Sequence, residues 1–320
     1  MRATSTEPQQ LSSIAADVLA GLSATPKTLP PKLFYDAAGS ELFEQITRLP
    51  EYYLTRRETS ILRGQAKAMV MAAGLPANVI ELGAGTAIKT RMILEALQAQ
   101  RGRVNFYPVD VSEAALDAAK ENLRGLPEVA VHPLFADYAS SMDFVGEIPG
   151  PRLILYLGSS IGNFEPLHAS LLLSHLRSML GARDTLLLGT DMAKDASVLL
   201  TAYDDAAGVT AAFNRNVLVR INRELGANFE PESFAHVARW NEMASRIEMH
   251  LESGRAQEVE IRGLQMRVRF QRGETIHTEN SYKFTPTMVE SILRNGRFVR
   301  ECTWMDSRQW FALHLARTSS

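Results

Sequence analysis

The feature that most constrains the fold is a regular alternation of short apolar runs with amphipathic stretches, which begins near residue 61. Two of the apolar runs, RLILYL at 152–157 and TLLLG at 185–189, are apolar throughout, which is typical of strands buried on both faces of a parallel sheet. The sequence therefore predicts an α/β fold with a doubly wound sheet. Its strands are expected at 78–82, 104–109, 130–134, 152–157 and 185–189, and its helices at 87–99, 112–123 and 167–180.

The alternation is interrupted between residues 194 and 283. Residues 197–225 have a helical pattern but are rich in Asn, Asp and Arg, and residues 234–281 alternate apolar and polar side chains with a period of two, as antiparallel strands do. After Pro286, a helix at 287–295 and strands at 298–305 and 310–315 resume the first pattern. We therefore expect one domain formed by 58–193 plus 284–320. A second, inserted α+β domain is expected from 194–283, completed by the N-terminal segment 1–57.

The most specific local motif is VIELGAGTAIKTRMIL at 79–94, a strand followed by a glycine turn and a helix. Gly83 and Gly85 permit a tight turn and let a ligand approach bare backbone at a helix N-terminus. The third glycine of a dinucleotide-binding fingerprint is replaced by Ile88. Asp110 ends the next strand, where a carboxylate can accept both ribose hydroxyls. Asp137 and Tyr138, after the third strand, could flank an adenine. These residues leave S-adenosylmethionine (SAM) and NAD as candidate ligands, with SAM preferred.

Composition excludes several classes of function. The 320 residues suit about two domains, and 34 basic against 36 acidic residues give a net charge of -2. That balance offers no basic surface for nucleic acid or an acidic membrane. Cys302 is the only cysteine, and the seven histidines show no H-x-x-x-H spacing, so a disulfide within the chain is excluded and a metal site is not expected. No segment has the pattern of a signal peptide or a membrane span, and we expect a cytoplasmic protein.

Beyond the glycine motif, long blocks of the sequence resemble those of the bacterial L-histidine Nα-methyltransferases of ergothioneine biosynthesis. The resemblance implies a Rossmann-like class I methyltransferase domain with a family-specific substrate domain. It also implies SAM as the methyl donor, L-histidine as the small-molecule substrate, and three methyl transfers that give the betaine hercynine; we expect a monomer. The matching blocks are PPKLFYDAAGSELFEQITRLPEYYLTR, ELGAGTAIKTRMIL, LGSSIGNFEP, LLLGTDMAKD, AYDDAAGVTAAFNRNVLVRINRELGA, RIEMHL and HTENSYKF.

The resemblance also implies the residues of the site. Tyr138 stands where the family has a phenylalanine, an exchange that keeps an aromatic ring beside the adenine. Asn163, Tyr35 and Gly158 are expected at the reacting amine. The positions matching the family's SAM contacts are Gly83, Lys89, Asp110, Asp137 and Tyr138, and those expected to bind histidine are Tyr52, Asn163, Tyr203, Met249, Glu279, Asn280 and Ser281.

The side chains suit this chemistry. Transfer of a methyl group from a sulfonium needs a neutral amine held in line with the methyl, so alignment matters more than a strong base. Asn163 offers both a donor and an acceptor to such an amine. Glu279 and Ser281 alternate on one expected strand and therefore point to the same face, where they could hold the two nitrogens of an imidazole.

Four alternatives stay open. A relative that methylates another amino acid, such as tryptophan, should lack a carboxylate aimed at the ring. An NAD-dependent oxidoreductase is disfavoured by the missing third glycine, and a nucleic-acid methyltransferase by the net charge of -2. A catalytically inactive scaffold is disfavoured because the expected site positions all carry competent side chains.

Overall fold

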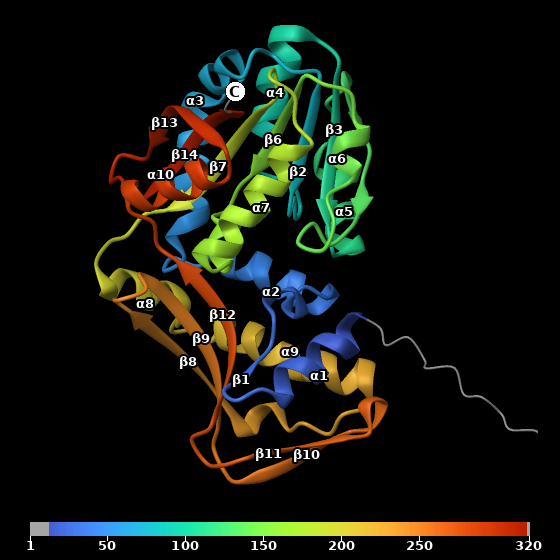
Figure 1. The fold of residues 1–320 in the computed structure, drawn as a ribbon, viewed down its shortest axis with the longest axis vertical. Helices are drawn as coiled ribbons and strands as arrows, with labels where there is room; N and C mark the ends of the chain where they lie inside the picture. The colour runs from blue at the N-terminus through green and yellow to red at the C-terminus, as the bar shows by residue number, and fades with distance from the viewer. Residues whose placement is uncertain (1–12, 319–320) are drawn as a thin grey trace, which may run out of the picture.

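The structure, a computed structural model, describes residues 13–318. It contains two large sheets, one above the other in Figure 1. The upper sheet in the figure has eight strands in the order β13-β14-β7-β6-β2-β3-β4, with β5 beside β3. Only β14 runs antiparallel to its neighbours β7 and β13. The strands are β2 (Asn78–Leu82), β3 (Val104–Asp110), β4 (Val129–Val131), β5 (Leu134–Phe135), β6 (Arg152–Tyr156), β7 (Thr185–Asp191), β13 (Phe298–Met305) and β14 (Phe311–Thr318).

Helices cover both faces of the eight-stranded sheet, as the continuous apolar runs predict. In β6 every residue is buried: Leu153 and Leu155 pack into the core on one face, whereas Ile154 and Tyr156 pack into the core on the other. The sheet is therefore the middle of three layers. Its helices are α3 (Tyr53–Ala72), α4 (Thr90–Arg101), α5 (Glu113–Asn122), α6 (Phe144–Glu147), α7 (Pro166–Ser178) and α10 (Pro286–Asn295).

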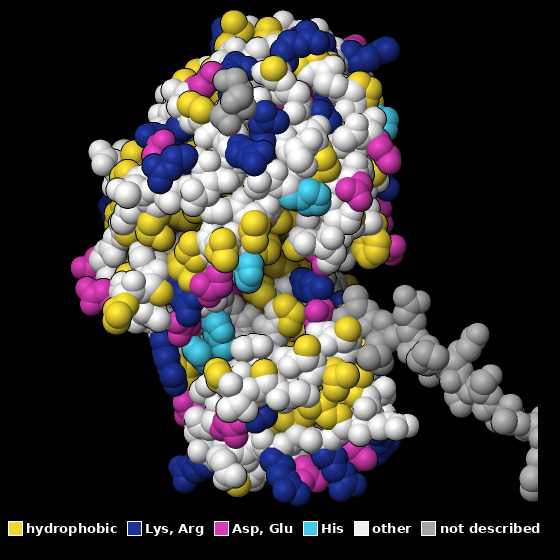
Figure 2. All heavy atoms as spheres, in the orientation of Figure 1, with side chains coloured by type: hydrophobic (Ala, Val, Ile, Leu, Met, Phe, Trp, Pro, Cys, Tyr) yellow, Lys and Arg dark blue, Asp and Glu magenta, His cyan; other side chains and the backbone are white. Residues whose placement is uncertain are grey.

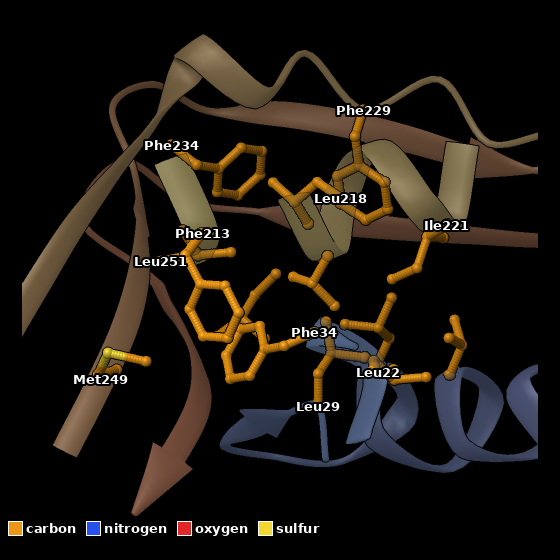
Figure 3. Packing of buried hydrophobic residues seen from close by; sticks show 14 of the residues in the cluster. Leu22, Leu29, Phe34, Phe213, Leu218, Ile221, Phe229, Phe234, Met249 and Leu251 are labelled. Atoms are coloured by element: carbon orange, nitrogen blue, oxygen red, sulfur yellow. The ribbon is translucent and has the colours of Figure 1, made fainter. Parts of the chain in front are cut away.

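The lower sheet has four strands in the order β1-β12-β9-β8, in which N-terminal β1 pairs parallel with β12. A two-stranded ribbon, β10-β11, lies beside it. Figure 3 shows the core that these elements share, with Phe34 of the N-terminal segment packed against Phe213 at a ring distance of 4.6 Å. The elements are α1 (Ser13–Ser23), β1 (Lys27–Thr28), α2 (Ala37–Arg48), α8 (Ala196–Tyr203), α9 (Val209–Leu225), β8 (Phe234–Asn241), β9 (Arg246–Ser253), β10 (Gln257–Ile261), β11 (Met266–Phe270) and β12 (Thr275–Tyr282).

The polar residues of α9 have structural partners. The side chain of Asn214 donates to the carbonyl of His250 at 3.0 Å, and that of Asn222 both donates to and accepts from the backbone of Phe229 at 2.8 Å. Buried amides that satisfy backbone groups hold neighbouring segments at fixed positions. The unusual Asn content of this helix therefore serves packing within the lower half.

Most predicted elements are confirmed, and the differences have local causes. Ser112 caps α5 as predicted, its Oγ accepting from the Ala115 amide at 3.3 Å. The helix predicted from 87 begins at Thr90, because Ala87 has a left-handed φ of 54° that extends the glycine turn. The strand predicted at 130–134 is two short strands, β4 and β5. The helical stretch 197–225 is two helices, and Asp205 accepts from the first amides of the second, at Val209 and Thr210.

The predicted domain boundaries stay a prediction. One of them, between residues 57 and 58, falls inside the single helix α3, so the chain is continuous and helical there. The first twelve residues of the predicted second domain lie outside the described residues.

The surface carries both signs of charge. On the face shown in Figure 2, basic and acidic side chains are interspersed, and hydrophobic side chains gather near the junction of the two halves. Within 13–318, no helix combines the length and apolar character needed to cross a membrane.

A buried ion pair at the start of β6 stabilises the eight-stranded sheet. Asp184 accepts from the Arg152 amide at 2.6 Å and from its guanidinium at 2.7 Å, and both side chains are almost fully buried. We expect Asp184→Ala to lower the free energy of unfolding by about 3–5 kcal/mol, because it leaves Arg152 buried without its counter-charge. Urea unfolding measures this. Glu95→Ala, which breaks the exposed Arg91–Glu95 pair, should cost about 0.5 kcal/mol or less. Equal losses would contradict this account.

Candidate active site

The carboxyl ends of β2, β3, β6 and β7 meet at one edge of the eight-stranded sheet, beside the lower half of the molecule (Figure 1). The glycine turn follows β2 at this edge. Gly83 and Gly85 have φ values of 70° and 52°, a region that favours glycine. The amides of Gly83 and Ala84 both donate to the Val109 carbonyl, at 2.9 and 3.0 Å. The turn is therefore held against β3 and leaves a backbone cradle at the sheet edge.

Asp110 organises this cradle. One carboxylate oxygen accepts from the Gly85 amide at 2.9 Å and the other from the Ser112 amide at 3.0 Å. Burial raises the pKa of Asp110, and the backbone N–H groups act in the opposite direction. Each oxygen keeps a further lone pair, so the carboxylate can still accept two ribose hydroxyls.

Tyr138 forms the other wall of the cradle, and Asp137 precedes it in the chain. A Cβ at Gly83 would lie 3.5 Å from the Tyr138 ring, so the ring covers the turn. Asp137 accepts from Lys32 at 3.2 Å, and this ion pair brings the N-terminal segment to the cradle. Partial burial acts to raise the pKa of Asp137, but the Ser140 hydroxyl, together with Lys32 and the Ala139 amide, holds it below its ordinary value. Sequence reasoning missed Lys32.

Lys89 and Gly158 are joined by a residue that sequence reasoning also missed. Glu58, on α3, is fully buried; it pairs with the Lys89 ammonium and accepts from the Gly158 amide at 2.8 Å. A signal for it existed, because Glu58 lies at helical spacing between buried Leu54 and Ile61, on the apolar face of α3. Glu58 thus ties the glycine-turn helix to the loop after β6.

That loop borders a cavity of about 520 Å³, including space open to solvent, between the two halves. Tyr35, Phe43, Tyr52 and Phe213 supply an aromatic wall, with the Tyr35 and Phe43 rings 5.7 Å apart. The predicted residues that line the cavity are Tyr35, Tyr52, Gly158, Asn163, Tyr203, Met249, Glu279 and Ser281.

Asn280 is the exception among the predicted histidine-binding residues. It lies on the opposite face of β12 from its neighbours Glu279 and Ser281, is absent from the cavity lining, and donates to Glu165 at 3.1 Å. Strand alternation alone predicts this placement, and Asn280 therefore lies outside the cavity.

The three cavity tyrosines are protonated at neutral pH. Burial raises the pKa of Tyr35, Tyr52 and Tyr203 well above the ordinary value of 10, with neighbouring carboxylates adding to the effect. Each therefore offers a hydroxyl group and not a phenolate, so none is suited to act as a general base.

Glu279 is directed into the cavity by a β-bulge. The register between β12 and β9 shifts between His277 and Glu279, after which Glu279 pairs with Met249, also a cavity residue. Bulges of this kind redirect side chains next to active sites. The Glu279 carboxyl is largely buried but borders the cavity, through which water can reach it. Burial raises the pKa of this carboxyl to about 7, and the charge of Lys283 opposes the shift.

Ser281 and Tyr203 form a second polar group in the cavity, with their hydroxyl oxygens 2.7 Å apart. Behind them lie Lys283, which donates to both at 2.8 Å, and Asp191. Sequence reasoning missed this pair, although Lys283 continues the spacing of Glu279 and Ser281, and Asp191 ends a strand at the same sheet edge as Asp110.

The described residues fit SAM better than a metal. Among residues 13–318, no group of three or more His, Cys, Asp or Glu side chains is placed to hold a metal ion. The glycine cradle and the free lone pairs of Asp110 suit a nucleoside, and Tyr138 offers an aromatic edge beside it.

The cradle predicts an effect on cofactor binding. We expect Asp110→Ala to weaken SAM binding by about 10- to 100-fold, because hydrogen bonds to a charged group are worth about 1.5–3 kcal/mol. Isothermal titration calorimetry measures the affinity, and circular dichroism checks that the fold is kept. Asp117→Ala, at an exposed position on α5, is the matched control and should bind SAM as the wild type does. Unchanged affinity in Asp110→Ala would rule out the ribose role.

The shifted pKa of Glu279 predicts a pH-dependent stability. Because its pKa is about 7 in the folded protein and 4.5 ordinarily, the folded state binds more protons in that window, and stability falls as pH rises through it. Glu279→Gln removes this loss of stability at higher pH, because the glutamine side chain does not titrate. The variant should gain about 2–3 kcal/mol relative to wild type between pH 5 and pH 8, as measured by urea unfolding at both pH values. Glu252→Gln, at a more exposed side chain on β9, serves as the control. A stability difference between Glu279→Gln and wild type that stays the same at pH 5 and pH 8 would show that the pKa of Glu279 is not raised.

Comparison with known proteins agrees with this geometry. The family described as histidine-specific, SAM-dependent methyltransferase matches residues 14–318. The chain is 46% identical over 307 residues to the histidine N-alpha-methyltransferase of Mycolicibacterium smegmatis, covering 95% of this chain and 94% of that protein. It is 31% identical over 281 residues to ergothioneine biosynthesis protein 1 of Schizosaccharomyces pombe, covering 84% of this chain and 36% of the relative.

Among solved structures, the fold is similar to magnesium protoporphyrin IX methyltransferase from Synechocystis with bound SAH. The TM-score is 0.50 at 15% sequence identity, over 89% of this chain and 96% of that one. This similarity confirms the predicted Rossmann-like class I fold. From the match over nearly its whole length, the chain belongs to the family of histidine-specific, SAM-dependent methyltransferases.

Proposed function

We propose that this protein transfers three methyl groups from SAM to the α-amine of L-histidine, giving hercynine for ergothioneine biosynthesis. The observation that carries the proposal is the position of the cavity. It lies between the loop after β6, at the cofactor edge of the sheet, and the Glu279–Ser281 segment of β12. An amino acid held there would place its amine towards the cofactor and its side chain towards the carboxylate.

Asn163, Gly158 and Tyr35 are proposed to hold the amine. Bound SAM supplies a methyl group on a sulfonium that a neutral amine can attack. The Gly158 amide is used by Glu58, so the group that Gly158 offers the amine is its carbonyl oxygen. Asn163 can accept from an amine N–H in the first two rounds; in the third the dimethylated amine has no N–H, and its lone pair stays free to attack the methyl group. The released proton can pass to water, since the tyrosines stay protonated.

Glu279 is proposed to select histidine. A largely buried carboxylate is stabilised by a ring N–H, and an apolar side chain such as that of phenylalanine or leucine would leave it without a partner. Met249, which pairs with Glu279 across the sheet, limits the room for a larger ring such as indole. Tyr52 and Tyr203 can donate to the substrate carboxylate.

The cofactor contacts at Gly83, Lys89, Asp110, Asp137 and Tyr138 are part of the same proposal. So are a monomeric state, a cytoplasmic location and the lack of nucleic-acid or membrane partners, which rest on the sequence alone.

The proposal is tested by incubating the purified protein with SAM and each of the twenty amino acids, followed by mass spectrometry. We expect histidine to gain up to three CH₂ increments on its α-nitrogen, and the other amino acids to gain none at comparable rates. Asp110→Ala is the matched variant, in which SAM use should fall. Methylation of another amino acid, such as tryptophan, in preference to histidine would overturn the role of Glu279. Absence of methylation of all twenty would overturn the proposed substrate class.

A further inference from the structure

Lys283 is a lysine with no exposed surface, at the point where β12 leaves the lower sheet. Its ammonium donates to Tyr203 Oη and to Ser281 Oγ, both at 2.8 Å, and it lies 2.9 Å from Asp191 Oδ2. An ammonium has three N–H donors. All three are used, so Lys283 has no donor left for the cavity and acts only through its neighbours.

This arrangement restricts which hydrogen bonds the hydroxyl groups of Tyr203 and Ser281 can make. Each of the oxygens of Tyr203 and Ser281 has one lone pair occupied by Lys283, and the oxygens lie 2.7 Å apart, so one hydroxyl donates to the other. Of their two protons, one is therefore left for the cavity. When Ser281 donates to Tyr203, the Tyr203 proton is free to donate and Ser281 keeps one lone pair that can accept.

We propose that Lys283 is a positioning residue that leaves this pair of hydroxyls a single free proton. A bound substrate carboxylate then selects the arrangement in which Tyr203 donates to it, and Ser281 is left as an acceptor for an imidazole N–H. The inference rests on the proposed function, since it concerns how that substrate is recognised. Glu279 also accepts, so the cavity presents two acceptors to the ring and therefore favours histidine with a proton available on each ring nitrogen.

Asp191 binds the Lys283 ammonium, but it also has other partners that keep its buried carboxylate hydrogen-bonded. The Tyr53 hydroxyl donates to the same carboxylate at 2.7 Å, and Lys194 pairs with its other oxygen. Removal of the Lys283 ammonium therefore leaves Asp191 with two partners, which makes a folded variant attainable. Lys194 offers a matched control, because it is bound to Asp191 and Tyr53 but to neither Tyr203 nor Ser281.

The test is the affinity of the full-length protein for L-histidine, measured by calorimetry in the presence of S-adenosylhomocysteine so that no turnover occurs. We expect Lys283→Met to weaken histidine binding by about 10- to 100-fold, the usual range for hydrogen bonds to charged groups, while binding of S-adenosylhomocysteine changes less than about 2-fold. Lys194→Met should lower the melting temperature but keep histidine affinity within about 2-fold of wild type. If Lys283→Met does not fold, Lys283→Gln is measured; its amide keeps two N–H donors for Tyr203 and Ser281, so histidine affinity should fall by less than about 10-fold while binding of S-adenosylhomocysteine stays within about 2-fold.

A double-mutant cycle separates positioning from mere support of the fold. If Lys283 acts through Ser281 and Tyr203, the effect of Lys283→Met should shrink several-fold in a Ser281→Ala background. Equal loss of histidine affinity in Lys283→Met and Lys194→Met, or fully additive effects in the cycle, would overturn the positioning role. Failure of the wild type to bind histidine would instead overturn the proposed function.

Discussion

The junction between Asp191 and Lys283 connects the two halves of this protein. Asp191 ends β7 at the cofactor edge of the eight-stranded sheet, and Lys283 follows β12 of the four-stranded sheet, so their ion pair joins the two sheets in a fully buried position. Backbone contacts run alongside it, with the Phe284 amide donating to the Asp191 carbonyl at 2.8 Å. Such a buried pair is costly to desolvate and depends on complete hydrogen bonding, which Tyr53, Lys194, Tyr203 and Ser281 provide.

The loop after β6 depends on this junction. The Asp191 amide donates to Ser159 Oγ at 2.9 Å, which fixes the loop that carries Gly158 and Asn163. On its other side the loop packs against β12, where a Cβ at Gly162 would lie 2.9 Å from the Tyr282 carbonyl oxygen. One sheet thus supplies the cofactor edge, the other supplies the strand that we propose to bind histidine, and the loop between them is held by both. Placement of the two reactants in line is the main requirement of methyl transfer, and a loop held by hydrogen bonds and packing on both sides suits that requirement.

The N-terminal segment completes the site from the other direction. Tyr35 and Tyr52 line the cavity, Lys32 pairs with Asp137, and Glu44 of α2 accepts from Thr86 in the glycine turn at 3.0 Å. Helix α2 lies between the two halves in Figure 1. Residues from three distant parts of the chain therefore meet around one cavity.

The sequence by itself determined the class of fold, the order of nearly all elements and the glycine turn with its following Asp110, because periodicity and turn chemistry are local properties. Family resemblance supplied the cavity residues, and all but Asn280 line it. Only the tertiary structure decided the roles of four charged residues, Glu58, Lys283, Asp191 and Lys32. Each is a charged residue whose role comes from a partner far along the chain, such as Lys283 with Asp191 or Lys32 with Asp137. Charge and hydrophobicity patterns predict such residues to be exposed, whereas burial and pairing depend on which strands and helices are brought together when the two sheets join.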